Sequence, residues 1–151
     1  MAMTMNGEVQ LAVPREAVWA KLNDPDVPKA CIPGCEELEK TEDNGFRAVA
    51  KMKVGPVSAR FKGKVMLSDL DPPNGYKISG EGEGGVAGFA KGGATVGLSD
   101  KDGGTLLTYN VEAQIGGKLA QLGQRLIAGT AKKLADEFFA NFAKAVGGSA
   151  A

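Results

Sequence analysis

The spacing of apolar residues in this chain changes once, near residue 116, and that change limits the folds open to it. Between residues 36 and 115 apolar and polar residues alternate with a period of two, which is typical of strands with one buried face. Between residues 117 and 146 apolar residues recur at helical spacing, and no proline interrupts them. Turn sequences such as Asp43-Asn44-Gly45 divide the first region. We therefore expect one long helix at residues 117–146, preceded by strands at residues 36–42, 46–54, 57–67, 76–84, 89–99 and 105–115.

The residues before this region add a strand and two short helices. Residues 3–13 alternate like the later strands, and Pro14 stands where the first turn of a helix tolerates a missing N–H. We expect that helix to end near Asn23 and a second one at residues 27–32. A sheet with one apolar face packs most economically when it curves around the final helix. The order predicts an α+β helix-grip fold, with a curved seven-stranded antiparallel sheet wrapped around a long C-terminal helix. We expect a single domain over residues 1–146 and a disordered tail over residues 147–151.

The composition excludes several kinds of function. The chain has no histidine among its 151 residues, which rules out Ser-His-Asp and Cys-His nucleophile pairs. Its formal net charge is zero, whereas proteins that bind nucleic acid usually carry a basic excess. Three residues separate Cys31 from Cys35, although a thioredoxin-like redox pair needs two, so we expect reduced thiols. We expect no catalytic residue, no metal and no cofactor.

Targeting signals are also missing from the sequence. No apolar run approaches the roughly 18 residues that a membrane-spanning helix needs. The first ten residues lack both the basic region and the apolar region of a signal peptide. We therefore expect a cytoplasmic location.

The inward positions of the predicted sheet carry unusually small residues. Protein interiors are close-packed, so missing side-chain volume is either filled from elsewhere or left as a cavity. One interpretation is an apolar tunnel between the sheet and the final helix. The other is that the glycines only bend the sheet, and that helix side chains fill the gap. The small inward residues are Ala48, Ala50, Ala59, Gly63, Gly80, Gly82, Gly84 and Ala113. The walls of the tunnel would be Met52, Phe61, Val65, Ile78, Tyr109, Leu122, Leu126 and Phe138.

A few polar residues are candidates for contacts. Arg125 could reach the cavity mouth and hold a ligand carbonyl, or it could extend its head into solvent. Tyr76 and Tyr109 could donate hydrogen bonds to a ligand, but we expect strand tyrosines with satisfied hydroxyl groups. Lys62 and Lys64 belong to a basic outer face that could dock an acidic partner or an anionic membrane. The alternative is a solvated sheet face, on which glutamates of the next strand pair with the lysines.

Several segments, taken in order, carry a resemblance to a known family. They are Pro14 to Leu22 with Asn23-Asp24-Pro25, Cys31-Ile32-Pro33-Gly34-Cys35-Glu36, Lys53-Val54-Gly55-Pro56-Val57 with Phe61-Lys62-Gly63, Gly116 to Ile127, and Phe138-Phe139-Ala140-Asn141-Phe142. With them the chain resembles the CoxG family of carbon monoxide dehydrogenase proteins, within the START/Bet v 1-like (SRPBCC) superfamily of ligand-binding helix-grip proteins. The resemblance covers about residues 3–146.

The resemblance implies accessory work and not catalysis. We expect a protein that binds a hydrophobic small molecule, such as a quinone or a lipid, and serves a large molybdenum-containing oxidoreductase (a molybdenum hydroxylase) of carbon monoxide dehydrogenase type. Contact with the inner face of the membrane would be peripheral and would come through that partner. One alternative is an assembly or recruitment chaperone without a stable ligand. The other is a cyclase-like or hydrolase-like enzyme of the same superfamily, which would need paired polar groups inside the cavity.

Overall fold

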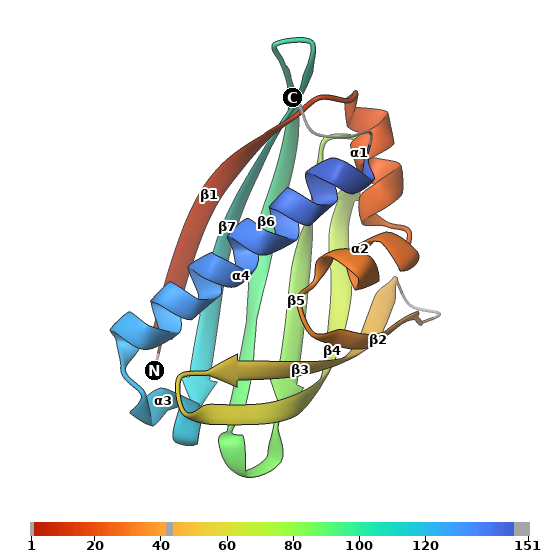
Figure 1. Ribbon diagram of the computed structural model, residues 1–151. Coiled ribbons are helices and arrows are strands. Elements are labelled where there is room, and N and C mark those ends of the chain that lie inside the picture. The colour runs from red at the N-terminus through yellow and green to blue at the C-terminus, as the bar shows by residue number, and fades with distance from the viewer. Residues whose placement is uncertain (1, 42–43, 147–151) are drawn as a thin grey trace.

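The computed structural model describes residues 2–41 and 44–146 of the chain. Its strands form one antiparallel sheet in the order β1-β7-β6-β5-β4-β3-β2 (Figure 1). Apart from β1, each strand pairs with the strand next to it in sequence, because short turns join them. The strands are β1 (Ala2–Leu11), β2 (Cys35–Lys40), β3 (Gly45–Val54), β4 (Val57–Asp71), β5 (Gly75–Glu83), β6 (Phe89–Lys101) and β7 (Gly104–Gly116).

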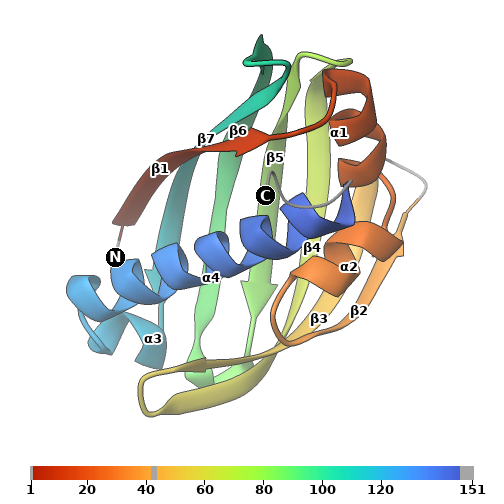
Figure 2. The ribbon, with the colours of Figure 1, turned by 45° about the horizontal axis from the view of Figure 1, so that its top comes forward.

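The helices lie on one side of this sheet. The longest, α4 (Gln124–Ala145), crosses the concave side, while α1 (Arg15–Leu22) and α2 (Asp26–Cys31) close one end (Figure 2). A short helix, α3 (Lys118–Gln121), precedes α4, and a 3₁₀ turn, η1 (Gly85–Ala87), connects β5 to β6. The backbone of α4 comes close to α2, to the edge strand β1 and to β3. The helix thus spans the concave side from one flank of the sheet to the other.

The structure confirms the predicted fold class and corrects one element. The predicted helix at residues 117–146 is interrupted, because the chain leaves α3 after Gln121 and begins α4 at Gln124. Gly123 stands at the break with φ 92° and ψ 153°, a conformation that glycine adopts far more easily than other residues. A Cβ at Gly123 would meet no atom within 4 Å, so backbone conformation, and not close packing, favours glycine there. The predicted tail at residues 147–151 lies outside the described residues.

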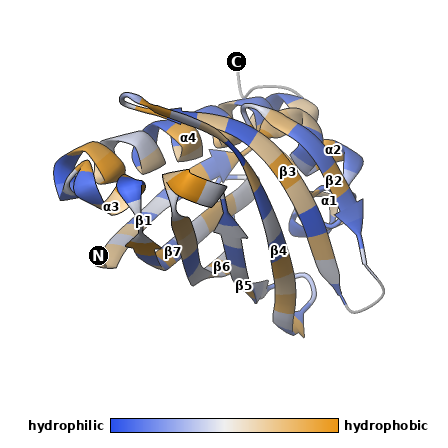
Figure 3. Ribbon diagram, turned by 90° about the horizontal axis from the view of Figure 1, so that it is seen from below, coloured by the Kyte–Doolittle hydropathy of each residue, from blue (hydrophilic) through white to orange (hydrophobic). Residues whose placement is uncertain are grey.

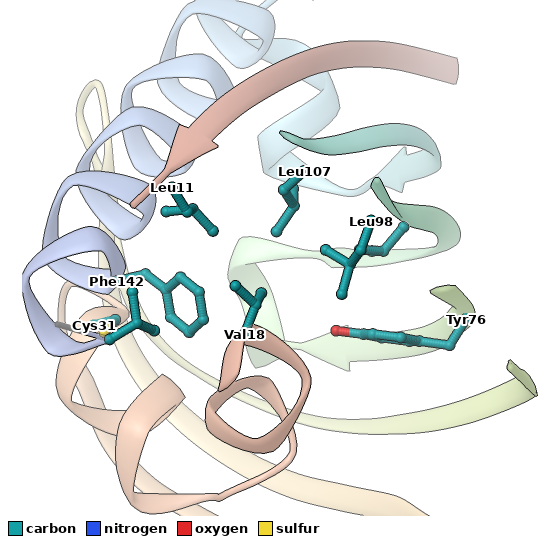
Figure 4. Close-up of a cluster of buried hydrophobic side chains, with 9 residues drawn as sticks. Leu11, Val18, Cys31, Tyr76, Leu98, Leu107 and Phe142 are labelled. Atoms are coloured by element: carbon teal, nitrogen blue, oxygen red, sulfur yellow. The ribbon is translucent and has the colours of Figure 1, made fainter. Parts of the chain in front are cut away.

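The buried side chains form two separate clusters. The first lies at the end closed by α1 and α2, and Figure 4 shows several of its members pointing toward one another. The second lies where α3 and the start of α4 meet the opposite end of the sheet. The first cluster consists of Leu11, Val18, Cys31, Tyr76, Val96, Leu98, Leu107, Phe142 and Val146. The second consists of Met3, Val54, Ile115, Leu119 and Ile127.

Two hydrogen bonds link distant segments at the closed end. Thr105, which is fully buried at the start of β7, donates from its hydroxyl to the carbonyl of Val13 at 2.7 Å. Asn141 of α4 donates from its side-chain amide to the carbonyl of Cys31 at 3.1 Å. Since Cys31 ends α2, this second bond holds the C-terminal half of α4 against the short helices. The closed end is therefore the firmly packed part of the structure.

Candidate ligand-binding site

The strand register brings the small inward residues together. One row across four neighbouring strands is formed by Ala48, Gly63, Gly82 and Ala90. A second row beside it contains Gly80, Gly92 and Ala113. Gly80 and Gly82 share the face of β5 that carries the buried Tyr76, so they face α4 as predicted. The alternation that produces this face is visible as successive hydrophobic and hydrophilic bands along β3 and β4 in Figure 3.

The glycines of the inner face are not all covered in the same way. A Cβ at Gly84 would lie 2.6 Å from the ring of Phe61, and one at Gly7 would overlap the hydroxyl oxygen of Tyr109. A Cβ at Gly82 would meet two atoms within 4 Å, and both belong to the neighbouring strand: the carbonyl oxygen of Lys62 at 3.5 Å and the Cα of Gly63 at 3.8 Å. Among the described residues, no side chain of α4 therefore fills the space above Gly82.

The predicted wall residues are distributed between the two clusters and the region that separates them. All of the strand residues in this set lie on the inner face, and all are partly exposed. Ile78, Tyr109 and Phe138 pack against the first cluster. Phe61 and Leu122 pack against the second. The remaining three, Met52, Val65 and Leu126, belong to neither.

Leu126 takes a position that the interrupted helix explains. It is 38% exposed, and its Cδ2 would lie 2.8 Å from a Cβ at Gly55, in the turn between β3 and β4. Because α4 begins at Gln124, Leu126 and Arg125 fall in its first turn and not in the middle of a longer helix. Arg125 is exposed, and its contact with a ligand remains a prediction.

Aromatic rings line the helix side of the space. Tyr109 stacks on Phe139 with ring centroids 5.1 Å apart. Phe138 meets Phe139 edge to face at 5.0 Å and stacks on Phe142 at 5.9 Å. Across the space, Trp19 of α1 meets Tyr76 edge to face at 5.3 Å. These rings offer flat apolar surfaces that suit planar ligands.

Polar groups on the inner face are few. The Thr105 hydroxyl is satisfied by Val13, as described above. Tyr109 projects over Gly7, and its hydroxyl lies near enough to Lys132 of α4 to contribute a little to the raised pKa of that lysine, which Asp136 mainly causes. Tyr76 is buried, and burial raises the pKa of its phenol to about 12. Within the described residues its hydroxyl has no hydrogen-bond partner, contrary to the sequence-based expectation. The sequence offered no signal for this, because partnering depends on where the ring points.

Two grooves lie on the outer face of the sheet, and none of the predicted wall residues borders them. The larger, of about 760 Å³, runs across β2 to β6 and contains Lys62 and Lys64. Cross-strand register places Lys62 beside Glu83 and Lys64 beside Glu81. Four basic and four acidic residues line this groove, so its formal charges balance: Arg47, Lys62, Lys64 and Lys91 against Glu37, Glu39, Glu81 and Glu83. The smaller groove, of about 380 Å³, lies over β1, β7 and β6.

The outer face also carries ion pairs, and the two thiols are unreactive in character. Arg47 pairs with Glu39 at 3.2 Å and Arg60 with Glu36 at 2.5 Å. Burial raises the pKa of both Cys31 and Cys35, and neither forms a disulfide.

In the described residues, no group of three histidine, cysteine, aspartate or glutamate residues is placed to hold a metal. No helix in residues 2–41 and 44–146 combines the length and apolar character that a bilayer crossing needs.

The fold is shared with several solved structures. A conserved protein from Geobacillus kaustophilus matches with a TM-score of 0.90 and 34% identity over 95% of each chain. An uncharacterised protein from Rhizobium leguminosarum matches with a TM-score of 0.72 and 14% identity, over 97% of this chain and 95% of the other. The Zhui aromatase/cyclase from Streptomyces matches with a TM-score of 0.69 and 13% identity, over 97% of this chain and 94% of the enzyme. At such low identity the last two show the fold alone.

The sequence itself also identifies a family. No curated protein matches the chain. The model of the CoxG family, described as the G component of carbon monoxide dehydrogenase, matches residues 7–147. This match covers nearly the whole chain and agrees with the resemblance carried by the sequence segments. The chain therefore belongs to the carbon monoxide dehydrogenase CoxG family.

Proposed function

We propose that this protein binds a neutral hydrophobic molecule, such as a quinone or a lipid, between the inner face of its sheet and α4. One observation carries the proposal: among the described residues, the space above Gly82 is not filled from α4. Apolar residues of the same face, such as Met52 and Val65, remain partly exposed although they point inward. Covering such surface with a ligand is favourable by roughly 25 cal/mol per Å² of apolar area removed from water.

The family name supplies the proposed partner. A CoxG protein of carbon monoxide dehydrogenase would act beside a large molybdenum-containing oxidoreductase. A carrier of a hydrophobic electron acceptor would serve such an enzyme in the cytoplasm, at the inner face of the membrane. Membrane contact would then be peripheral.

The inner face argues against an enzyme. General acid–base catalysis needs groups that exchange protons near neutral pH and lie within hydrogen-bond reach of each other. Beyond the satisfied Thr105, the tyrosines Tyr76 and Tyr109 are the polar side chains on the inner face of the described strands. A phenol with a pKa of about 12 is a poor proton donor or acceptor near neutral pH. The aromatase/cyclase shares the fold at 13% identity, which does not transfer its activity.

An assembly chaperone would use the outer groove instead. The Lys62→Glu, Lys64→Glu double variant separates the two functions, because both residues lie on the face opposite the proposed ligand. A ligand carrier should keep its ligand affinity in this variant. Loss of partner binding with unchanged ligand binding would show that the outer groove docks the oxidoreductase.

Trp19 allows a direct test of ligand binding. It is the single tryptophan of the chain, and its ring lies against Tyr76 at the inner face. Titration with a decyl-substituted benzoquinone should quench its fluorescence in a saturable manner. A Gly82→Leu variant should bind the quinone much more weakly, since the new side chain occupies the space above Gly82. The matched control is Glu81→Leu, which adds the same side chain to the next residue of β5 on the outer face. A failure to quench, or equal binding by both variants, would contradict the proposal.

A further inference from the structure

Tyr76 combines two properties that seldom occur together. Its side chain is part of the first cluster and is 7% exposed. Figure 4 shows the ring extending from β5 toward Val18 of α1, with its hydroxyl aimed into the cluster. In the described part of the chain, no hydrogen bond satisfies this hydroxyl. A buried polar group without a partner costs free energy, and proteins usually avoid it.

The hydroxyl is nevertheless not sealed off. Among the described residues, no side-chain nitrogen or oxygen is both fully enclosed and without a hydrogen-bond partner. Since Tyr76 has no partner, its hydroxyl oxygen must border space that a small molecule can reach. The neighbouring inward residue of the same strand, Ile78, is partly exposed and begins the open part of the inner face. The hydroxyl therefore lies at the closed end of the proposed ligand space.

We propose that the Tyr76 hydroxyl donates a hydrogen bond to a neutral acceptor, such as a ketone, quinone or ester carbonyl, at the buried end of the ligand. This inference rests on the proposed function and names the chemistry that the site selects. Burial keeps the phenol protonated far above neutral pH, so it acts as a donor under physiological conditions. A hydrophobic molecule with an acceptor at one end would satisfy the hydroxyl, and its apolar remainder would cover the inner face.

The charge pattern favours a neutral acceptor over a carboxylate. Burying an ionised carboxylate is costly unless a cation pairs with it. No lysine or arginine occupies an inward position of the described strands. Lys132 of α4 is exposed and is bound to Asp136 at 2.9 Å. The site should therefore prefer quinones and esters to fatty-acid anions of similar length.

The experiment compares two tyrosines and three probes on the full-length protein. The probes are a decyl-substituted benzoquinone, decylbenzene and decanoate, and displacement of Nile red reports the binding of each. Tyr76→Phe removes the proposed donor, while Tyr109→Phe removes the hydroxyl that lies over Gly7. We expect Tyr76→Phe to weaken quinone binding by about 2-fold to 10-fold, the range that one net hydrogen bond supports. Decylbenzene binding should not change, and Tyr109→Phe should leave both affinities unaltered.

A spectroscopic measurement separates hydrogen bonding from packing. Donation from Tyr76 should lower the carbonyl stretching frequency of the bound quinone, and Tyr76→Phe should restore the higher frequency. If Tyr76→Phe weakens quinone and decylbenzene equally, or leaves the carbonyl frequency unchanged, the inference is wrong while the carrier function stands. Decanoate binding as tight as quinone binding would also overturn it. If the wild-type protein binds neither the quinone nor decylbenzene, both the inference and the proposed function fail.

Discussion

Replacing Gly82 by alanine should stabilise this protein, although most substitutions of glycine in a sheet row would not. The new Cβ would lie 3.5 Å from the carbonyl oxygen of Lys62 and 3.8 Å from the Cα of Gly63, which are ordinary contact distances. Replacing a glycine at an unstrained position lowers the conformational entropy of the unfolded chain and stabilises by about 0.4–1 kcal/mol. For a chain of this length, a gain of about 1 kcal/mol raises Tm by roughly 2–4 °C. Gly82→Ala should thus raise Tm by about 1–4 °C.

Gly92→Ala provides the matched comparison on the same inner face. Its Cβ would overlap the carbonyl oxygen of Glu112 and lie 2.7 Å from the Cα of Ala113. Both atoms belong to the backbone of β7, so β6 and β7 would have to separate locally. We expect a loss of about 1–3 kcal/mol, the usual cost of overpacking. Urea denaturation and thermal unfolding by circular dichroism measure both variants. If Gly82→Ala were as destabilising as Gly92→Ala, the space above Gly82 would be filled, and the reasoning behind the ligand site would be refuted.

Three further predictions concern the closed end. Phe142→Ala should destabilise the fold by about 3–5 kcal/mol in urea denaturation, because Phe142 is fully buried and its removal leaves a cavity; a loss below about 1 kcal/mol would show that the first cluster is loosely packed. Asn141→Ala should cost about 1 kcal/mol by removing the hydrogen bond to the Cys31 carbonyl, and an Asn141→Ala variant as stable as the wild type would show that this bond contributes nothing. Unfolding free energy should fall by up to about 3 kcal/mol as the pH rises from about 10 to about 12, because the Tyr76 phenol ionises near 10 when unfolded and near 12 when folded. Tyr76→Phe should remove that part of the decline, and an identical pH profile for the variant would contradict the assignment.

Much of the fold could be predicted because the alternation in the strands is regular. Inward and outward positions follow from a period of two, so the inner face of β3, β4 and β5 could be read directly from the sequence. The turn sequences indicated which strands pair. The interruption at Gly123 was missed, since a glycine inside an apolar helical pattern is compatible with both a continuous and a broken helix. Only the backbone conformation at Gly123, with its positive φ, distinguishes the two.

The candidate site could be predicted only in outline. Small inward residues such as Gly80 and Gly82 pointed to missing volume, but their grouping into rows depends on the strand register. Which glycines are covered depends on side-chain directions, such as that of the Phe61 ring over Gly84. The unpartnered hydroxyl of Tyr76 depends in the same way on the path of α1 and cannot be read from a strand pattern. Nor did the basic residues reveal an outer groove with balanced charges, because the glutamates beside Lys62 and Lys64 come from another strand.

The most direct test of the ligand site is extraction of the purified protein with organic solvent, followed by mass spectrometry, together with native mass spectrometry of the intact chain. The account predicts a neutral apolar compound with a carbonyl or similar acceptor, present at close to one molecule per chain, or taken up at that ratio when a quinone is added. A protein that carries no such compound, and that neither binds added quinone nor shows quenching of Trp19, would contradict it.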